Sequence, residues 1–214
     1  MFKRELSKKE IEILKSVIEF IRIKHSSEMG HDYSHVLEVC RFAIEIGKAI
    51  KEPLDPFITI CGALMHDIGR VGASDGRFHG IDGGSRAREF LEGVIEDSET
   101  IVKITKLIVR HTPTSMIEPK TNEEKVVCDA DGIERLGLMG MVRGIMGKTG
   151  SMEFIIKDRI KKRLSDFDKL FFDESRKIAL PYYKETLAIV RSLERALDQR
   201  IEQIKDIESL KALY

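Results

Sequence analysis

Apolar residues recur at intervals of three and four along most of this chain, which is the spacing of one face of an α-helix. The first such stretch opens with a capping box formed by Ser7 and Glu10 and runs to about Lys24. Two further helices are expected at residues 34–50 and 57–68, and both are apolar on most faces, as buried helices are. No segment alternates apolar and polar residues with a period of two over the length of a β-strand. The pattern therefore predicts an all-α bundle.

The middle of the chain alternates between helical periodicity and turn residues. In order, the pattern predicts a glycine-rich loop at residues 69–84, helices at 85–95 and 98–110, a break at Pro113–Pro119, and a helix opened by the capping box of Thr121 and Glu124 that ends near Leu138. Glycines from Gly137 to Gly150 leave the end of that last helix open. Loops between buried helices are where a site would be expected.

The C-terminal part, residues 151–214, is charged and amphipathic, and Pro181 is expected to interrupt it. We expect residues 1–214 to form one domain, with a core at about 28–146 and a helical extension at about 151–214. The helices over 183–210 could pair two chains in a homodimer, although packing back over the bundle is the commoner arrangement for a chain of this size.

Composition limits the classes of function. The 214 residues include 36 Lys and Arg and 36 Asp and Glu, so the net charge of zero offers no field that would attract a long nucleic acid. Three widely spaced cysteines favour a reducing, cytoplasmic setting, and no apolar stretch has the length of a signal peptide or a membrane span. One Asn and two Gln beside many charged residues are typical of proteins from hot environments.

Three apolar helical segments each carry groups that are costly to bury without partners. His66 and Asp67 end one segment and His35 lies in the first turn of another, while the third carries the carboxylates Asp129 and Asp131. These two carboxylates are about 200° apart on a helix, and periodicity does not say which faces inward. Imidazoles and carboxylates from several helices predict one shared divalent metal ion with positions open for water.

The order His35, then His66-Asp67 within "LMHDIGR", then Asp131 within "VVCDADGIERLG" resembles the HD-domain metal-dependent phosphohydrolases. The resemblance implies an HD-domain helical bundle with additional C-terminal helices. It also implies that His35, His66, Asp67 and Asp131 hold the metal, with Asp67 as the catalytic residue, and it selects Asp131 over Asp129. The segments "GHDYSH" and "DADGIERLGLMG" are most similar to small bacterial and archaeal HD hydrolases that act on nucleotides.

The remaining histidines and two arginines complete the candidate site. His79 and His111 match positions that hold a second metal in binuclear branches of the superfamily, where Asp67 would bridge the two ions. Arg70 and Arg143 are candidates for binding phosphate oxygens. His25 and His31 have no assigned role, and we expect them at the surface or behind the ligands.

The resemblance implies an enzyme that hydrolyses a phosphate ester or anhydride of a nucleotide or a related small phosphorylated metabolite. It would use water activated by one or two divalent ions drawn from Mn, Fe, Co, Ni, Mg or Zn. Alternatives remain open: an HD-fold di-iron oxygenase, a cyclic-dinucleotide or dinucleotide phosphodiesterase with a binuclear site, and a scaffold that the metal only stabilises. No GYP tripeptide follows the site, and no acidic run follows His66-Asp67, which disfavours the HD-GYP and guanosine tetraphosphate hydrolase branches.

Overall fold

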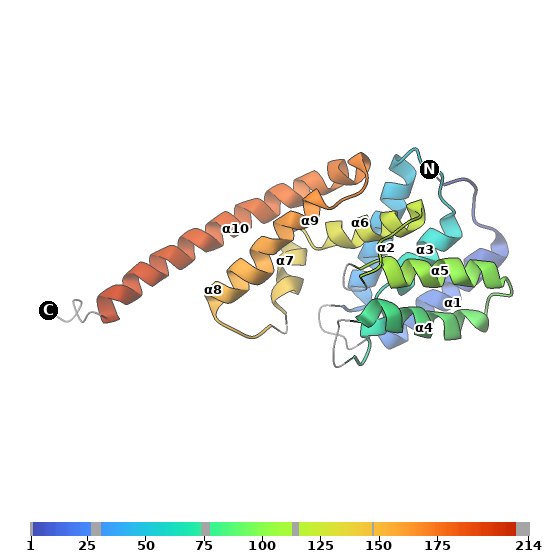
Figure 1. Cartoon of the computed structure of the whole chain (residues 1–214), viewed down its shortest axis with the longest axis horizontal. Helices are drawn as coiled ribbons and strands as arrows, with labels where there is room; N and C mark the ends of the chain where they lie inside the picture. Colours follow the sequence, from blue (N-terminus) through green and yellow to red (C-terminus); the bar gives the residue numbers. More distant parts are fainter. Residues whose placement is uncertain (1, 27–30, 74–77, 113–115, 147, 209–214) are drawn as a thin grey trace.

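The computed structural model describes residues 2–26, 31–73, 78–112, 116–146 and 148–208, and Figure 1 shows them as helices joined by short connections. Within these ranges the only β-type pairing is an isolated bridge between Phe2 and Leu54, so the all-α prediction is confirmed. The N-terminal helices are α1 (Lys8–Lys24), α2 (Tyr33–Ala49), α3 (Pro56–Met65), η1 (Ile68–Arg70), α4 (His79–Glu92), α5 (Ser98–Arg110) and α6 (Asn122–Glu134). No described helix is both long and apolar enough to cross a bilayer.

Side-chain caps define where these helices begin. The Ser7 hydroxyl accepts from the Glu10 amide while the Glu10 carboxylate accepts from the Ser7 amide, and Thr121 and Glu124 form the same box at the start of α6. Asp55 caps α3, where Pro56 needs no hydrogen-bond partner for its nitrogen. Both predicted capping boxes are therefore confirmed, because the signal is local in the sequence.

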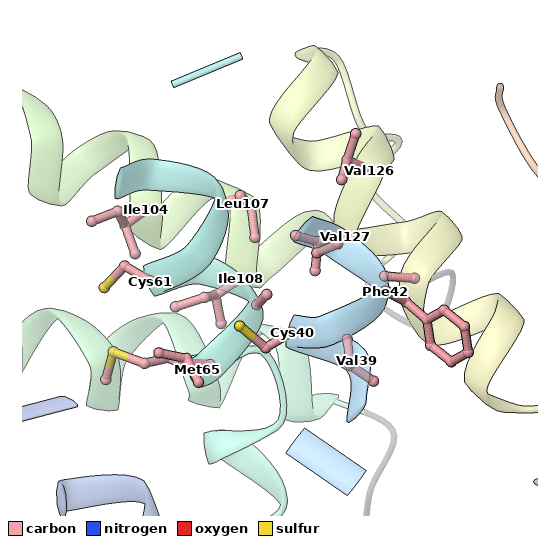
Figure 2. Close-up of a cluster of buried hydrophobic side chains, with 14 of the residues drawn as sticks. Val39, Cys40, Phe42, Cys61, Met65, Ile104, Leu107, Ile108, Val126 and Val127 are labelled. Carbon is pink, nitrogen blue, oxygen red and sulfur yellow. The ribbon is translucent and has the colours of Figure 1, made fainter. Parts of the chain in front are cut away.

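The main core lies where α2, α3, α5 and α6 meet, and Figure 2 shows its side chains converging. Val39 of α2, Met65 of α3, Ile108 of α5 and Val127 of α6 are all fully buried. Met65 directly precedes His66, and Ile108 lies one turn before His111. The apolar contacts that hold the four helices together thus also fix the positions of the chemistry-bearing residues.

Helix α4 begins earlier than expected, at His79 instead of Ser85. The prediction that residues 79–84 belong to a loop is therefore wrong. The reason is that its glycines serve close packing. A β-carbon on Gly84 would lie 2.6 Å from Cγ2 of Val109, and one on Gly83 would lie 3.1 Å from Cγ2 of Ile108. Helix α4 therefore packs unusually close to α5. Residues 74–77 of that predicted loop, and 113–115 of the predicted break, fall outside the described residues.

The C-terminal part adds a second, smaller apolar cluster around Met141, Ile160 and Val190. The helices of this C-terminal part are α7 (Gly137–Ile145), α8 (Met152–Phe154), the π-helical segment η4 (Ile155–Ile160), η5 (Lys161–Arg163), α9 (Leu164–Asp168) and α10 (Asp173–Glu208). Figure 1 shows the end of α10 extending beyond the other helices.

The expectation that Pro181 interrupts the C-terminal part is wrong, because α10 continues through it. Pro181 is exposed, and so is Lys177, the residue whose carbonyl loses its donor. Tertiary packing on both sides of this residue, by Ala179 and Val190, holds the helix together.

Candidate metal centre

The predicted ligands come together at one end of the main core. His35 lies in the first turn of α2, His66 and Asp67 directly follow α3, His111 follows α5, and Asp131 lies on α6. In each of three overlapping groups the donor atoms all lie within 4.8 Å of one another. The groups are His31–His35–Asp67, His35–His66–Asp131 and His66–Asp67–His111. Residues far apart in the sequence thus form one compact set of nitrogen and oxygen donors.

Asp67 is the centre of this set. Its Oδ2 lies 3.3 Å from Nε2 of His35 and 3.5 Å from Nε2 of His66. Its Oδ1 lies 3.5 Å from Nε2 of His79 and 3.6 Å from Nε2 of His111. Each carboxylate oxygen therefore faces at least two imidazoles, an arrangement in which one carboxylate can contact two cations.

The orientation of two imidazoles tests whether these residues fit a metal ion. Nδ1 of His66 lies 2.8 Å from the Ala63 carbonyl, which can only accept, so this nitrogen carries the proton. Nδ1 of His35 lies 3.2 Å from Oε2 of Glu134, and its Nε2 lies 3.3 Å from Oδ2 of Asp67. Nε2 of His66 therefore presents a lone pair toward Nε2 of His35 at 3.3 Å and toward Oδ2 of Asp67 at 3.5 Å. A lone pair that faces a carboxylate oxygen is repulsive unless a cation lies between them, so the donor set fits a divalent metal.

The structure also separates the two carboxylates of α6. Oδ1 of Asp131 lies 3.8 Å from Nε2 of His35. Asp129 points elsewhere, since its oxygens accept from the backbone amides of Phe171 and Phe172 at 2.8 and 3.1 Å. Asp131 is therefore the carboxylate that faces the cluster, while Asp129 ties α6 to the start of α10.

Electrostatics in the cluster favour a bound cation. Burial alone would raise the pKa of Asp67, but the charge of His66 and hydrogen bonds from His111, His31 and His35 outweigh it and hold the pKa well below its usual range. Burial likewise lowers the pKa of His35, yet its hydrogen bonds to Asp67 and Glu134 prevail and raise it to about 9. Without a metal, a proton on His35 thus takes up part of the role that a cation would have.

Residues 32–136 match the family model described as the HD domain. This match identifies residues 32–136 as an HD domain. YpgQ of Bacillus subtilis (strain 168) is 28% identical over 195 residues, which cover 87% of this chain and 93% of YpgQ. The crystal structure of Bacillus subtilis YpgQ in complex with ADP is similar with a TM-score of 0.69 at 23% identity, covering 88% of this chain and 96% of that one. An HD-superfamily hydrolase from Bacillus thuringiensis gives a TM-score of 0.65 at 18% identity, covering 88% and 98%.

Two groups of the cluster, His31 and Glu134, received no role from the sequence. His31 places Nδ1 2.6 Å from Oδ2 of Asp67, although its side chain is 29% exposed. Glu134 lies behind His35 and also accepts from Nη2 of Arg143. His25 is fully buried, and its Nδ1 is 2.7 Å from the His31 carbonyl, so it supports His31 from behind. The sequence signal for Glu134 was its position three residues after Asp131, one helical turn away.

The two candidate arginines, Arg70 and Arg143, lie at the site, but each already has a carboxylate partner. Nε of Arg70 donates to Oδ1 of Asp67 at 3.0 Å. Arg143 donates to Glu134, and its Nη2 lies 3.9 Å from Oδ1 of Asp131. A cavity of about 720 Å³ opens beside the metal ligands and is lined by His111, Asp131, Arg135, Met116, Lys169 and Phe171 among others.

Proposed function

We propose that this HD-domain protein is a metal-dependent phosphohydrolase that cleaves a phosphate ester or anhydride bond of a nucleotide or a related small phosphorylated metabolite. The observation that carries the proposal is the lone pair on Nε2 of His66 that faces Oδ2 of Asp67, which a cation would satisfy. In this proposal His35, His66, Asp67 and Asp131 hold one divalent ion. His79 and His111 would share a second ion with Asp67, whose other oxygen faces both of them.

The chain's own residues have separate tasks in this reaction. A bound divalent ion supplies Lewis acidity, which activates water and neutralises charge on phosphoryl oxygens. Asp67 is the catalytic residue, because both of its oxygens lie at the centre of the donor set. Glu134 orients His35 through Nδ1. Arg70 and Arg143 border the ligands and are positioned to bind phosphoryl oxygens.

Two observations support a nucleotide as substrate. The cavity beside His111 and Asp131 has room for a nucleoside and exposes the Phe171 ring, on which a base could stack. YpgQ, which covers most of this chain, has been crystallised in complex with ADP. A nucleotide in the cavity would place its phosphates toward the metal ligands.

Turnover of defined compounds tests the proposal. Full-length protein is loaded separately with Mn²⁺, Mg²⁺, Co²⁺, Ni²⁺, Zn²⁺ or Fe²⁺ and assayed with nucleoside mono-, di- and triphosphates, a cyclic dinucleotide and bis(p-nitrophenyl) phosphate. We expect hydrolysis that depends on the metal and is abolished by chelation. A fully loaded protein that hydrolyses none of these compounds would contradict the proposal. Product formed only in air, with consumption of oxygen, would instead support the di-iron oxygenase.

The number of ions can be counted independently of turnover. Elemental analysis of the wild type, His79→Ala and His111→Ala distinguishes the two arrangements. We expect about one ion fewer per chain in each variant if the centre is binuclear. An unchanged metal content in both variants would restrict the proposal to the His35–His66–Asp67–Asp131 site.

A further inference from the structure

Arg163 is a buried arginine without an acidic partner. Its side chain belongs to η5, the residue as a whole is 9% exposed, and its Nη1 donates to the Arg135 carbonyl at 2.8 Å. Among the described residues no carboxylate oxygen lies within 4.0 Å of its guanidinium nitrogens. Guanidinium groups that leave water normally pair with carboxylates, so this burial needs another explanation.

The backbone of α7 is shaped to hold this guanidinium. A β-carbon on Gly144 would lie 2.6 Å from Nε and 2.7 Å from Nη2 of Arg163, so any larger residue at position 144 would displace the group. The preceding η4 segment is π-helical, a conformation that is uncommon and frequently found at functional sites. The fold therefore keeps a defined place for Arg163 beside α7.

Further cations gather around Arg163. Burial and the charges of Arg135 and Arg143 lower the pKa of Arg163 to about 10, and burial together with the charges of Arg159, Arg70 and Arg163 lowers the pKa of Lys148. The charges of Glu134 and Asp166 also act on Arg163, but both carboxylates are hydrogen-bonded to other cations. Glu134 accepts from Arg143, and Asp166 accepts from Arg135 and Lys169. The result is an excess of positive charge in a partly dehydrated place.

This cation cluster adjoins the metal ligands. Arg143 links the two, because its Nη2 is 3.9 Å from Oδ1 of Asp131 and its charge acts on Arg163. Arg70 also links them, since it donates to Asp67 and acts on Lys148. Arg143 and Arg70 thus each act both on the candidate metal ligands and on the cation cluster.

We propose that Arg163, Arg143 and Lys148 form an anion subsite for those phosphoryl groups of the substrate that are not attacked. The inference rests on the proposed function and deepens it, because such a subsite selects substrates with at least two linked phosphoryl groups over monophosphates. Arg163 has unused donors on Nε and Nη2, and two parallel donors match the geometry of phosphoryl oxygens.

Binding of inorganic tripolyphosphate tests the subsite without a nucleoside. Calorimetry measures its Kd, as the magnesium complex, for full-length metal-loaded wild type, Arg163→Gln, Arg163→Lys and Lys157→Gln. The last is a matched control, because Lys157 is exposed on η4 and pairs with Glu153. We expect Kd to rise about tenfold or more in Arg163→Gln, as for loss of one charged hydrogen bond. Arg163→Lys should recover part of the affinity, and the control should match the wild type.

Kinetics then identify the source of the phosphoryl group. For a nucleoside triphosphate, we expect the KM of Arg163→Gln to rise in parallel with the Kd for tripolyphosphate, with a smaller change in kcat. An effect on binding of inorganic phosphate alone, with this KM unchanged, would overturn the proposal and make the cluster a site for free phosphate. Unchanged binding of tripolyphosphate would overturn it as well.

Two provisions keep the test decisive. If Arg163→Gln does not fold, Lys148→Gln at an exposed position takes its place, and a Kd equal to that of the wild type counts against the subsite. Calorimetry measures binding without turnover. Absence of hydrolysis would therefore contradict the proposed function, whereas the Kd for tripolyphosphate would still decide whether the subsite exists.

Discussion

The helices that carry the histidines and the helices at the C-terminus differ in which side chains they bury and which they expose. Around the candidate metal ligands, charged and polar side chains are buried, and His35, His66, Asp67, His79 and His111 are all nearly inaccessible. The C-terminal part has its own small apolar cluster, yet many of its large apolar side chains are exposed. These are Leu138, Met139, Val142, Ile145, Met146, Met152, Phe154, Phe171, Leu180, Ile201, Ile204 and Ile207.

This contrast shows where the fold is constrained. The buried charges around Asp67 depend on partners of fixed geometry, so small changes there should have large effects. The end of α10 has few such requirements, and changes there should have little effect on the site. The homodimer expected from these C-terminal helices stays a prediction, and it would place the exposed isoleucines against a second chain.

The largest effect is expected from Asp67→Ala. The substitution removes a carboxylate that faces five imidazoles, so metal binding and hydrolysis should both be lost, with activity reduced by about a thousandfold or more. Elemental analysis and turnover measure this, and far-ultraviolet circular dichroism should show that the helices persist. As a matched control, Asp129→Asn removes a carboxylate from the same cluster of helices and should retain the metal. Stoichiometric metal in Asp67→Ala would refute the assignment of the site.

A smaller effect is expected from Glu134→Gln. Glu134 orients His35 from behind, and loss of a carboxylate that orients a ligating imidazole typically weakens metal affinity by about 10- to 100-fold. Competition with a metal-binding dye measures this affinity. Glu124→Gln is a useful control, since Glu124 is a buried carboxylate that pairs with Arg110 and caps α6 away from the ligands. Equal metal affinities in the wild type and Glu134→Gln would show that His35 needs no such support.

The pH dependence of metal affinity examines the same histidine. Because the pKa of His35 is raised from 6.5 to about 9 in the metal-free protein, the proton stabilises that form fully below pH 6.5, and this stabilisation is lost as the pH rises through 9. A metal ion must displace the proton, so its affinity should increase about tenfold per pH unit between pH 7 and 9. A flat profile over this range would mean that His35 is already neutral at pH 7.

The smallest effect is expected at the end of α10. Ile207 is 61% exposed, whereas Val190 of the same helix is 1% exposed. Ile207→Ala should change the free energy of unfolding by less than about 0.5 kcal/mol, while Val190→Ala should lower it by about 1–3 kcal/mol. Urea denaturation at two protein concentrations measures both values. A large, concentration-dependent loss in Ile207→Ala would show that a second chain covers this end.

The sequence predicted what depends on local signals or on burial of charge. Capping boxes begin α1 and α6 as expected, and His66-Asp67 at the end of an apolar helix indicated a shared cation. The position of His31 could not be predicted, because it depends on a contact with Asp67 across 36 residues. The predicted start of α4 was wrong because Gly83 and Gly84 allow close helix packing there. The sequence alone does not distinguish such glycines from glycines in a turn.

Arg163 illustrates a further limit. Along the sequence it lies in the basic run Arg159–Arg163, which reads as a solvated surface. Only the packing of η5 against Gly144 shows that its guanidinium is buried. The spacing of apolar residues in a sequence therefore does not show where a long basic side chain lies, because its position depends on the space that a neighbouring backbone leaves open.

His66 and His111 each end a helix, and each directs Nδ1 to the carbonyl three residues earlier, at 2.8 Å from Ala63 and 2.6 Å from Ile108. The same rings that face Asp67 through Nε2 therefore also close the last turns of α3 and α5. Occupancy of the metal centre should be transmitted directly to these two backbone ends. Amide hydrogen exchange in the final turns of both helices should slow when the protein is loaded, so the helix ends themselves would report on the ion.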